Sequence, residues 1–271
     1  MFYKKKNIFV FFVVLYFFSM AIPLFAMDVS TTSPWLTMMT RFIGGDYTKV
    51  HPLSVWNASG GMQPTYRYKG KSVVVALDDK DAKAFGFKKA REDVILLYKN
   101  LPAWGESRES LFFDPSKLPF LGQRILNVLS KLDPENYPYY QRRLAEFQSR
   151  LDSTLEMGRH LLSVTGGMDF TGASGPWIRA AIPGMVRPPN DLWVAWKKGE
   201  SLDSLQAALS EAQSRGWIVV TDAWTPLSIR EKVSAYPKRI ALVTPIVEAD
   251  MFVYLNNIYL EIWRAIRGFT P

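Results

Sequence analysis

Short apolar runs rich in β-branched residues alternate along this chain with segments in which apolar residues recur every three or four positions. The short runs predict strands, which lie at 28–31, 50–55, 72–77, 93–98, 161–165, 192–196, 217–222 and 240–244. The periodic segments predict helices at 34–44, 80–85, 118–131, 201–215, 226–236 and 248–267. Such alternation is typical of an α/β fold with mostly parallel sheets.

The longest helical pattern runs from Pro134 to Leu162 and follows Asp133, a candidate cap. Its apolar positions are spaced by three, four and seven residues and define one buried face: Leu144, Phe147, Leu151, Leu155 and Leu162. At about 1.5 Å per residue the helix approaches about 40 Å, long enough to join two halves of a small protein. We therefore expect two α/β lobes, at 27–133 and 163–271, joined by one interlobe helix at 134–162.

Residues 1–26 have the three parts of a secretory signal peptide. Lys4, Lys5 and Lys6 form a positive head, residues 8–18 form an uncharged apolar core, and Pro23 precedes a candidate cleavage site after Ala26. An uncleaved membrane anchor is the alternative, because the uncharged stretch nearly reaches the ~20 residues that span a bilayer. No cysteine follows the core to carry a lipid, so we expect a cleaved, periplasmic protein.

Composition narrows the function classes. The complete absence of cysteine excludes disulfides, thiolate metal sites and cysteine nucleophiles. The leader carries three of the eight net positive charges, and the remaining basic residues are scattered among acids, so no nucleic acid partner is expected. Nine tryptophans indicate large buried contacts or an aromatic cleft. The aromatic residues at or near predicted strand ends and loops are Trp56, Tyr66, Tyr68, Trp104, Phe112, Trp177, Trp193 and Trp224.

Motifs of enzymes are missing. The segment 172–176 has the wrong spacing for a nucleophile elbow, and no glycine-rich loop ends in Lys-Ser or Lys-Thr. The chain has only two histidines, His51 and His160, and nothing places either one beside a serine. We therefore expect no enzyme and no cofactor, with an unrecognised hydrolase as a third possibility.

Several scaffold motifs point to one family. Asp114-Pro115 precedes a helix, and Leu129 and Asp133-Pro134 lead into the long helix with Asn136 and Tyr140. Matching residues at the two ends of the chain are Thr31, Thr32, Ser33, Pro34, Gly44, Gly45, Leu53, Val243, Thr244, Pro245, Tyr254, Asn256 and Asn257. In these motifs the chain resembles the metal-type (zinc/manganese) substrate-binding proteins of ABC importers. The resemblance implies two lobes around a cleft, extracytoplasmic solute binding, and an ABC permease in the membrane as partner.

The resemblance also implies that the family's metal ligands are replaced. Its three histidine positions match Pro64, Ser110 and Gly167, and its last carboxylate matches Thr244. Proline and glycine offer no side-chain ligand, and neutral serine and threonine are poor ones. We therefore expect a divergent member without the usual metal site.

The cargo expected in its place is a small polar or organic solute, or a weakly held ion. The candidate site in the interlobe cleft consists of Tyr66, Ser110, Asp169 and Asp222, of which Asp222 matches an acidic position of the family. The alternative function is a non-transport accessory or interaction protein that kept the fold and lost the site.

Overall fold

The computed structural model of the protein describes residues 26–65, 68, 70, 72–87, 93–101 and 107–268. The predicted leader lies outside these residues except for Ala26, so the signal peptide remains a prediction. Tyr66 and Trp104 also lie outside them. None of the helices in the described ranges is long and apolar enough to cross a membrane.

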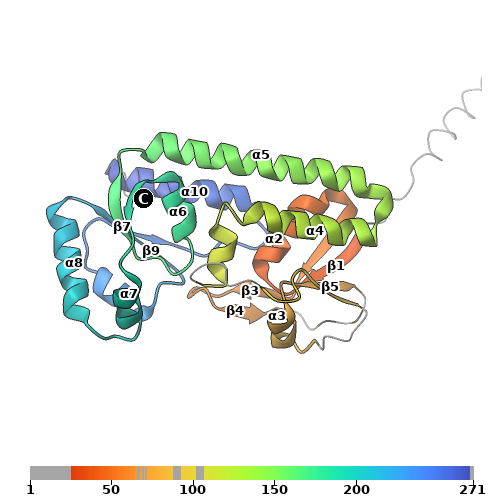
Figure 1. The fold of residues 1–271 in the computed structure, drawn as a ribbon, viewed down its shortest axis with the longest axis horizontal. Coiled ribbons are helices and arrows are strands. Elements are labelled where there is room, and N and C mark those ends of the chain that lie inside the picture. The colour runs from red at the N-terminus through yellow and green to blue at the C-terminus, as the bar shows by residue number, and fades with distance from the viewer. Residues whose placement is uncertain are drawn as a thin grey trace, which may run out of the picture.

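Two four-stranded parallel sheets form the two lobes of the molecule (Figure 1). The first sheet has the order β2-β1-β5-β6, with β1 (Met27–Thr31), β2 (Thr48–Pro52), β5 (Val73–Ala76) and β6 (Val94–Leu96). The second has the order β10-β9-β7-β8, with β7 (Gly166–Asp169), β8 (Gly184–Val186), β9 (Ile218–Asp222) and β10 (Arg239–Leu242). Because all pairs in both sheets are parallel, the carboxyl ends of the strands share one edge in each lobe.

Helices connect the strands in each lobe. The first lobe contains α2 (Pro34–Gly44), α3 (Asp79–Ala84), α4 (Leu118–Leu132) and the 3-10 helices η1 (Gly45–Tyr47), η2 (Glu109–Phe113) and η3 (Pro134–Asn136). The second contains α6 (Gly175–Ala181), α7 (Asn190–Lys197), α8 (Leu202–Ser214), α9 (Leu227–Val233) and α10 (Met251–Ile266). A short antiparallel hairpin, β3 (Ser54–Trp56) with β4 (Met62–Pro64), lies outside both sheets.

The long helix α5 (Tyr137–Leu162) extends over both lobes, with α10 beneath it in Figure 1. Its predicted apolar face is buried throughout and contacts α2 and α4 in one lobe and α6 and α10 across the other. The predicted fold class is confirmed: an α/β protein with mostly parallel sheets in two lobes joined by one long helix.

Two predicted strands are wrong. Residues 161–165 contain the end of α5, and the strand follows them as β7. Residues 192–196 lie in the helix α7, although Leu-Trp-Val-Ala-Trp is rich in strand-favouring residues. Pro188 and Pro189 followed by Asn190 are start signals of a helix, and in this case they prevail over the strand propensity of a five-residue run.

Gly158 on α5 permits close contact between α5 and α10. A Cβ atom at this position would lie 2.4 Å from Cε2 of Tyr259 on α10. We expect Gly158→Ala to lower the free energy of unfolding by about 1–2 kcal/mol, because overpacking outweighs the ~1 kcal/mol by which alanine favours a helix. Urea unfolding measures the change. Ser153→Ala, at an exposed position of α5, is the control and should leave stability unchanged or slightly higher.

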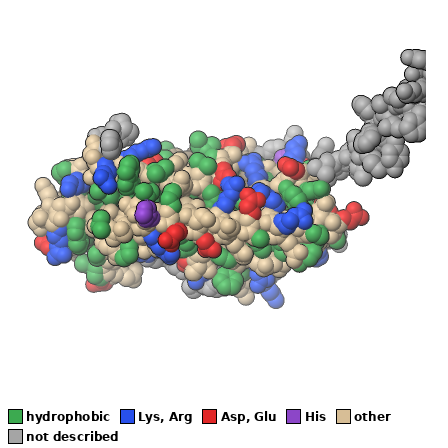
Figure 2. Space-filling model, turned by 90° about the horizontal axis from the view of Figure 1, so that it is seen from above, with side chains coloured by type: hydrophobic (Ala, Val, Ile, Leu, Met, Phe, Trp, Pro, Cys, Tyr) green, Lys and Arg blue, Asp and Glu red, His purple; other side chains and the backbone are tan. Residues whose placement is uncertain are grey.

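The surface seen from above carries no continuous band of one charge. Figure 2 shows Lys and Arg side chains interspersed with Asp, Glu and apolar groups over the described part of this face. This face therefore offers no basic stripe of the kind that tracks a phosphate backbone.

Candidate functional site

Aromatic side chains from both lobes meet between them and belong to one hydrophobic cluster. We call these six the aromatic interface: Trp35, Trp56, Phe112 and Phe113 of the first lobe, with Trp224 and Tyr254 of the second. The Trp224 ring lies 5.6 Å from Phe113 and 6.3 Å from Trp56, both edge-to-face. These centroid distances are those of favourable aromatic pairs, so apolar contact holds the lobes together here.

The three tryptophans contribute indole N–H groups to the aromatic interface, and the Tyr254 hydroxyl is bonded to Val243 O. Trp224 Nε1 donates a 2.9 Å hydrogen bond to Gly60 O in the other lobe. Gly60 has φ +76°, and a Cβ atom there would lie 2.7 Å from the indole, so a side chain would obstruct this approach. Nε1 of Trp35 and of Trp56 is buried and has no hydrogen-bond partner in the described part of the chain. Because an N–H presents its positive end, a metal cation among these groups would lose its water and gain no lone pair.

Asp222, at the end of β9, holds the loop that follows β7. Its Oδ1 accepts from the backbone N of Gly172 at 2.8 Å and of Trp224 at 3.1 Å. Its Oδ2 accepts from the backbone N of Ala173 and of Ser174, both at 2.9 Å. The carboxylate is 2 % exposed. Asp222 therefore acts as a buried anion for a loop of N–H groups, and its oxygens are not directed at a solute.

Both carboxylate oxygens of Asp169, at the end of β7, are also bound by protein donors. It is fully buried, and its Oδ1 accepts from Thr171 N at 3.0 Å and from Thr171 Oγ1 at 2.6 Å. Its Oδ2 pairs with Arg179 and lies 3.5 Å from Arg187 Nη1. A carboxylate that is surrounded by guanidinium groups is a poor ligand for a cation, because bound metal would have to displace them.

Ser110 is linked to the same loop through its neighbour. Its Oγ donates to Ser107 O at 2.7 Å, and Ser107 Oγ donates to Gly172 O at 3.2 Å across the lobes. The structure thus brings Ser110, Asp169 and Asp222 to one region, where each has protein partners. The fourth predicted residue, Tyr66, lies outside the described residues.

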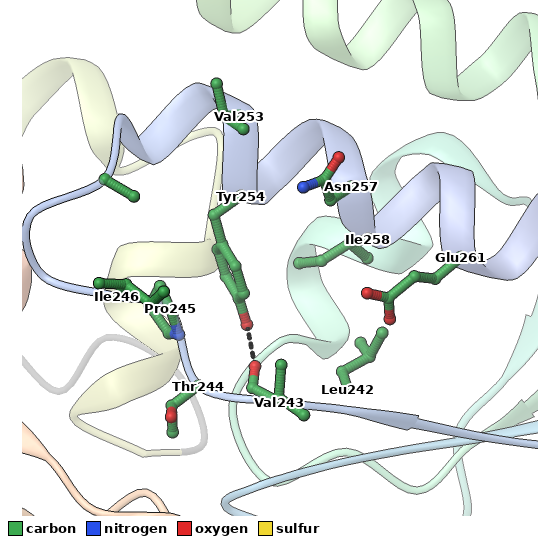
Figure 3. A pocket seen from close by; sticks show the side chains of 11 residues that line it. Leu242, Val243, Thr244, Pro245, Ile246, Val253, Tyr254, Asn257, Ile258 and Glu261 are labelled. Carbon is green, nitrogen blue, oxygen red and sulfur yellow. Dashed lines mark hydrogen bonds between the residues drawn. The ribbon is translucent and has the colours of Figure 1, made fainter. Parts of the chain in front are cut away.

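The positions that match the family's metal ligands do not form a polar site. Pro64 is exposed at the end of β4, and Gly167 lies within β7, so it does not open the following loop, which begins at Phe170. The strand predicted at 161–165 would have put Gly167 after a strand, whereas β7 includes it. Thr244 lies after β10, beside a mostly apolar groove in which Tyr254 OH donates to Val243 O at 2.9 Å (Figure 3).

The histidines lie apart from any cluster of acids in the described part of the chain. His51 Nε2 lies 2.7 Å from Asp28 Oδ1 in an exposed pair on neighbouring strands, and His160 is exposed on α5. Within the described ranges, no three His, Asp or Glu side chains are grouped so that they could hold a metal ion. The residues that match the family's ligand positions, Pro64, Ser110, Gly167 and Thr244, include no histidine and no carboxylate.

A polar cluster at the strand ends of the first lobe fixes the start of η2. Arg108 forms a bidentate pair with Asp78 at 3.1 and 2.7 Å. Burial tends to raise the pKa of Asp78, but the hydrogen bonds and charge of Arg108 and the backbone N–H groups of Asp81 and Lys80 together outweigh it, and the pKa is lowered. Asp81 accepts from Thr32 and from Leu77 N, and burial raises its pKa. This cluster positions the next residue of η2, Glu109, at the cleft.

A cavity of about 190 Å³ lies between the lobes and is lined from both. The first lobe contributes Ser107 and Glu109. The second contributes Gly172, Arg187, Trp193, Lys197, Trp224 and Pro226. We call it the interlobe cavity. It leaves room between the lobes for a small molecule, beside the aromatic interface.

Of the residues that line the cavity, only Trp193 and Trp224 were predicted for the cleft from the sequence. Glu109, Lys197 and Arg187 belong to no motif, and single charged residues carry no signal for a site. Arg187 directly follows β8, a three-residue strand that was not predicted, so its place at a strand end could not be inferred. Trp177, named with the cleft aromatics, is fully buried instead and stacks on Tyr259 at 5.5 Å.

No protein-family model matches the sequence, and no curated protein matches it. Several solved structures share this fold, and the match extends over nearly the whole of this chain and of each solved chain. ZnuA gives a TM-score of 0.65 over 88% of this chain and 98% of its own, at 18% identity. The SBP FpvC from Pseudomonas aeruginosa in complex with Mn²⁺ gives 0.60 over 90% and 100%, at 15% identity. A Zn(II)-bound variant of AdcAII from Streptococcus pneumoniae gives 0.62 over 88% and 98%, at 14% identity. The chain therefore has the two-lobed fold of the metal-type substrate-binding proteins that its motifs resemble.

Proposed function

We propose that this protein is a periplasmic solute-binding component of an ABC importer, and that its cargo is a small solute in place of a zinc or manganese ion. The interlobe cavity carries the proposal, since both lobes line it and a bound solute would contact both. The shared fold supports it, because similar structures include zinc-bound and Mn²⁺-bound proteins. The protein would deliver its cargo to a membrane permease without altering it chemically.

The absence of a metal cargo rests on three observations. Asp169 and Asp222 are committed to protein donors, the positions that match the family's ligands carry no histidine or carboxylate, and aromatic rings with unpartnered N–H groups lie between the lobes. Each one removes a requirement of a zinc or manganese site, namely available lone pairs converging in tetrahedral or slightly larger geometry.

Metal analysis and thermal unfolding test the proposal together. We expect purified protein to hold far less than one equivalent of zinc or manganese, and neither metal to raise the melting temperature. A cognate solute at one hundred times its dissociation constant should add about 2.7 kcal/mol to the free energy of unfolding. One tightly held equivalent of either metal would contradict the proposal.

An accessory or interaction protein is the second candidate, and the groove in Figure 3 favours it. Val243, Ile246 and Val253 on its rim are 66, 69 and 56 % exposed. Exposed apolar groups of this kind occur at protein contact sites. An accessory protein would bind its envelope partner whether or not a solute is present, and no solute would stabilise it. A solute-binding protein would be stabilised by its cargo.

A further inference from the structure

The interlobe cavity contains two opposite charges that have no partner in the described part of the protein. Glu109 lies on η2 of the first lobe, and Lys197 ends α7 of the second. No ion pair or hydrogen bond joins either side chain to another described residue, although both line the same cavity. Glu109 is partly buried, and a partly buried charge without a partner is unfavourable, whereas Lys197 is exposed and available to a ligand. A ligand that pairs with both charges would contact both lobes.

The surroundings of Glu109 favour a cationic ligand group. Burial raises the pKa of its carboxyl, and the charge of Arg108 opposes this only in part. Arg108 is already paired with Asp78, and the nearby Asp81 adds like charge. A ligand ammonium group beside Glu109 would supply the positive charge that the protein does not.

The opposite wall favours an anionic group and an apolar one. Lys197 and Arg187 are both on this wall, and the Arg187 guanidinium stacks on the Trp193 ring at 4.5 Å. Arg187 Nη1 is fixed by a 2.9 Å hydrogen bond to Thr171 O. The indoles of Trp193 and Trp224 present apolar surface to the space between the charges. At about 190 Å³ the cavity is smaller than the ~300 Å³ at which pockets for drug-sized ligands begin.

We propose that the interlobe cavity binds a small zwitterion of the amino-acid class, with its ammonium at Glu109, its carboxylate at Lys197 and its apolar side chain against Trp193. This inference rests on the proposed solute-binding function and specifies its cargo. A zwitterion contacts one charge on each lobe, so its binding would couple the two lobes.

Isothermal titration calorimetry with matched ligands tests the charge assignment. The probes are phenylalanine, leucine and tryptophan, together with the N-acetyl and methyl ester forms of whichever binds best. N-acetylation removes the cation and esterification removes the anion, while the side chain is unchanged. We expect the free amino acid to bind and each derivative to lose at least tenfold in affinity, which is about 1.4 kcal/mol.

Variants assign each ligand charge to a residue. Glu109→Gln should weaken the free amino acid at least tenfold but leave the N-acetyl form nearly unaffected, since that form has no ammonium to lose. Lys197→Met should weaken the free amino acid at least tenfold but leave the methyl ester nearly unaffected, since the ester has no carboxylate to lose. Lys198→Met and Glu200→Gln, which are exposed neighbours outside the cavity, are the controls and should bind as the wild type does.

The outcomes separate this inference from the proposed function. Binding of succinate or putrescine in preference to every amino acid would overturn the zwitterion and leave solute binding standing. If an amino acid binds both variants as tightly as it binds the wild type, its site does not lie in this cavity. If no amino acid binds the folded wild-type protein, the zwitterion is wrong, and the proposed function is then tested by thermal unfolding with other small solutes.

Discussion

Replacing Asp222 by asparagine is expected to lower the free energy of unfolding by about 3–5 kcal/mol. The carboxylate accepts four backbone hydrogen bonds, from Gly172, Ala173, Ser174 and Trp224. An asparagine keeps one acceptor oxygen and turns an NH₂ group toward two of these N–H donors. Each buried donor left without an acceptor costs about 1–3 kcal/mol, and the loss of a buried charge that compensates N–H groups adds to this.

Urea unfolding of the metal-free protein measures the effect, with Asp152→Asn on the exposed side of α5 as the control. The result also distinguishes a structural anion from a metal ligand. Removing a metal ligand would abolish stabilisation by metal but would leave the metal-free protein as stable as before. A change below 1 kcal/mol in the metal-free protein would therefore contradict the structural role assigned here to Asp222.

The location of Asp222 could be predicted from the sequence, but its role could not. Asp222 ends an apolar run, and parallel strands bring their carboxyl ends to one edge, where it lies. Asp169 ends β7, a strand whose glycine-rich sequence has no apolar run and which was predicted at 161–165 instead. Whether such a carboxylate faces a solute depends on which N–H and guanidinium groups reach it. Those donors come from the loop at 172–174 and from Arg179, so their positions are a property of the tertiary structure.

The sequence signal for that loop was present but ambiguous. Gly172-Ala173-Ser174-Gly175 is rich in small residues, which favour a turn but do not say what the turn binds. The structure adds the reason for Gly172, where a Cβ atom would lie 2.1 Å from Trp224 O. Small residues permit the backbone to approach an anion closely, and the anion here is the protein's own Asp222.

Long elements were predicted better than short ones for a physical reason. The 26 residues of α5 repeat their apolar spacing over many turns, so one interpretation fits them all. The residues 192–196 cover little more than one helical turn, in which helix and buried strand give the same apolar run. The hairpin of β3 and β4 has three residues in each strand and shows no alternation long enough to recognise.

Replacing Trp224 by alanine is expected to have the second large effect, because this side chain joins the lobes in two ways. Its ring contacts Trp56 and Phe113 of the first lobe, and its Nε1 donates to Gly60 O. Truncation of a large aromatic side chain costs about 3–5 kcal/mol when it is fully buried. Since Trp224 is partly buried, we expect a loss of about 3 kcal/mol.

The change should also separate the lobes, and solution X-ray scattering on the same variant should show a larger radius of gyration. Phe120→Ala, at a 60 % exposed position of α4, is the control and should change neither quantity. Because Trp224 also lines the interlobe cavity, the variant should bind the solute more weakly.

The zinc affinity of the same variant tests whether the aromatic interface conceals an intact metal site. Greater separation of the lobes without any gain in zinc affinity would show that it does not. If the variant instead bound one equivalent of zinc, the rings would be a cover over competent ligands, and a non-metal cargo would no longer be tenable.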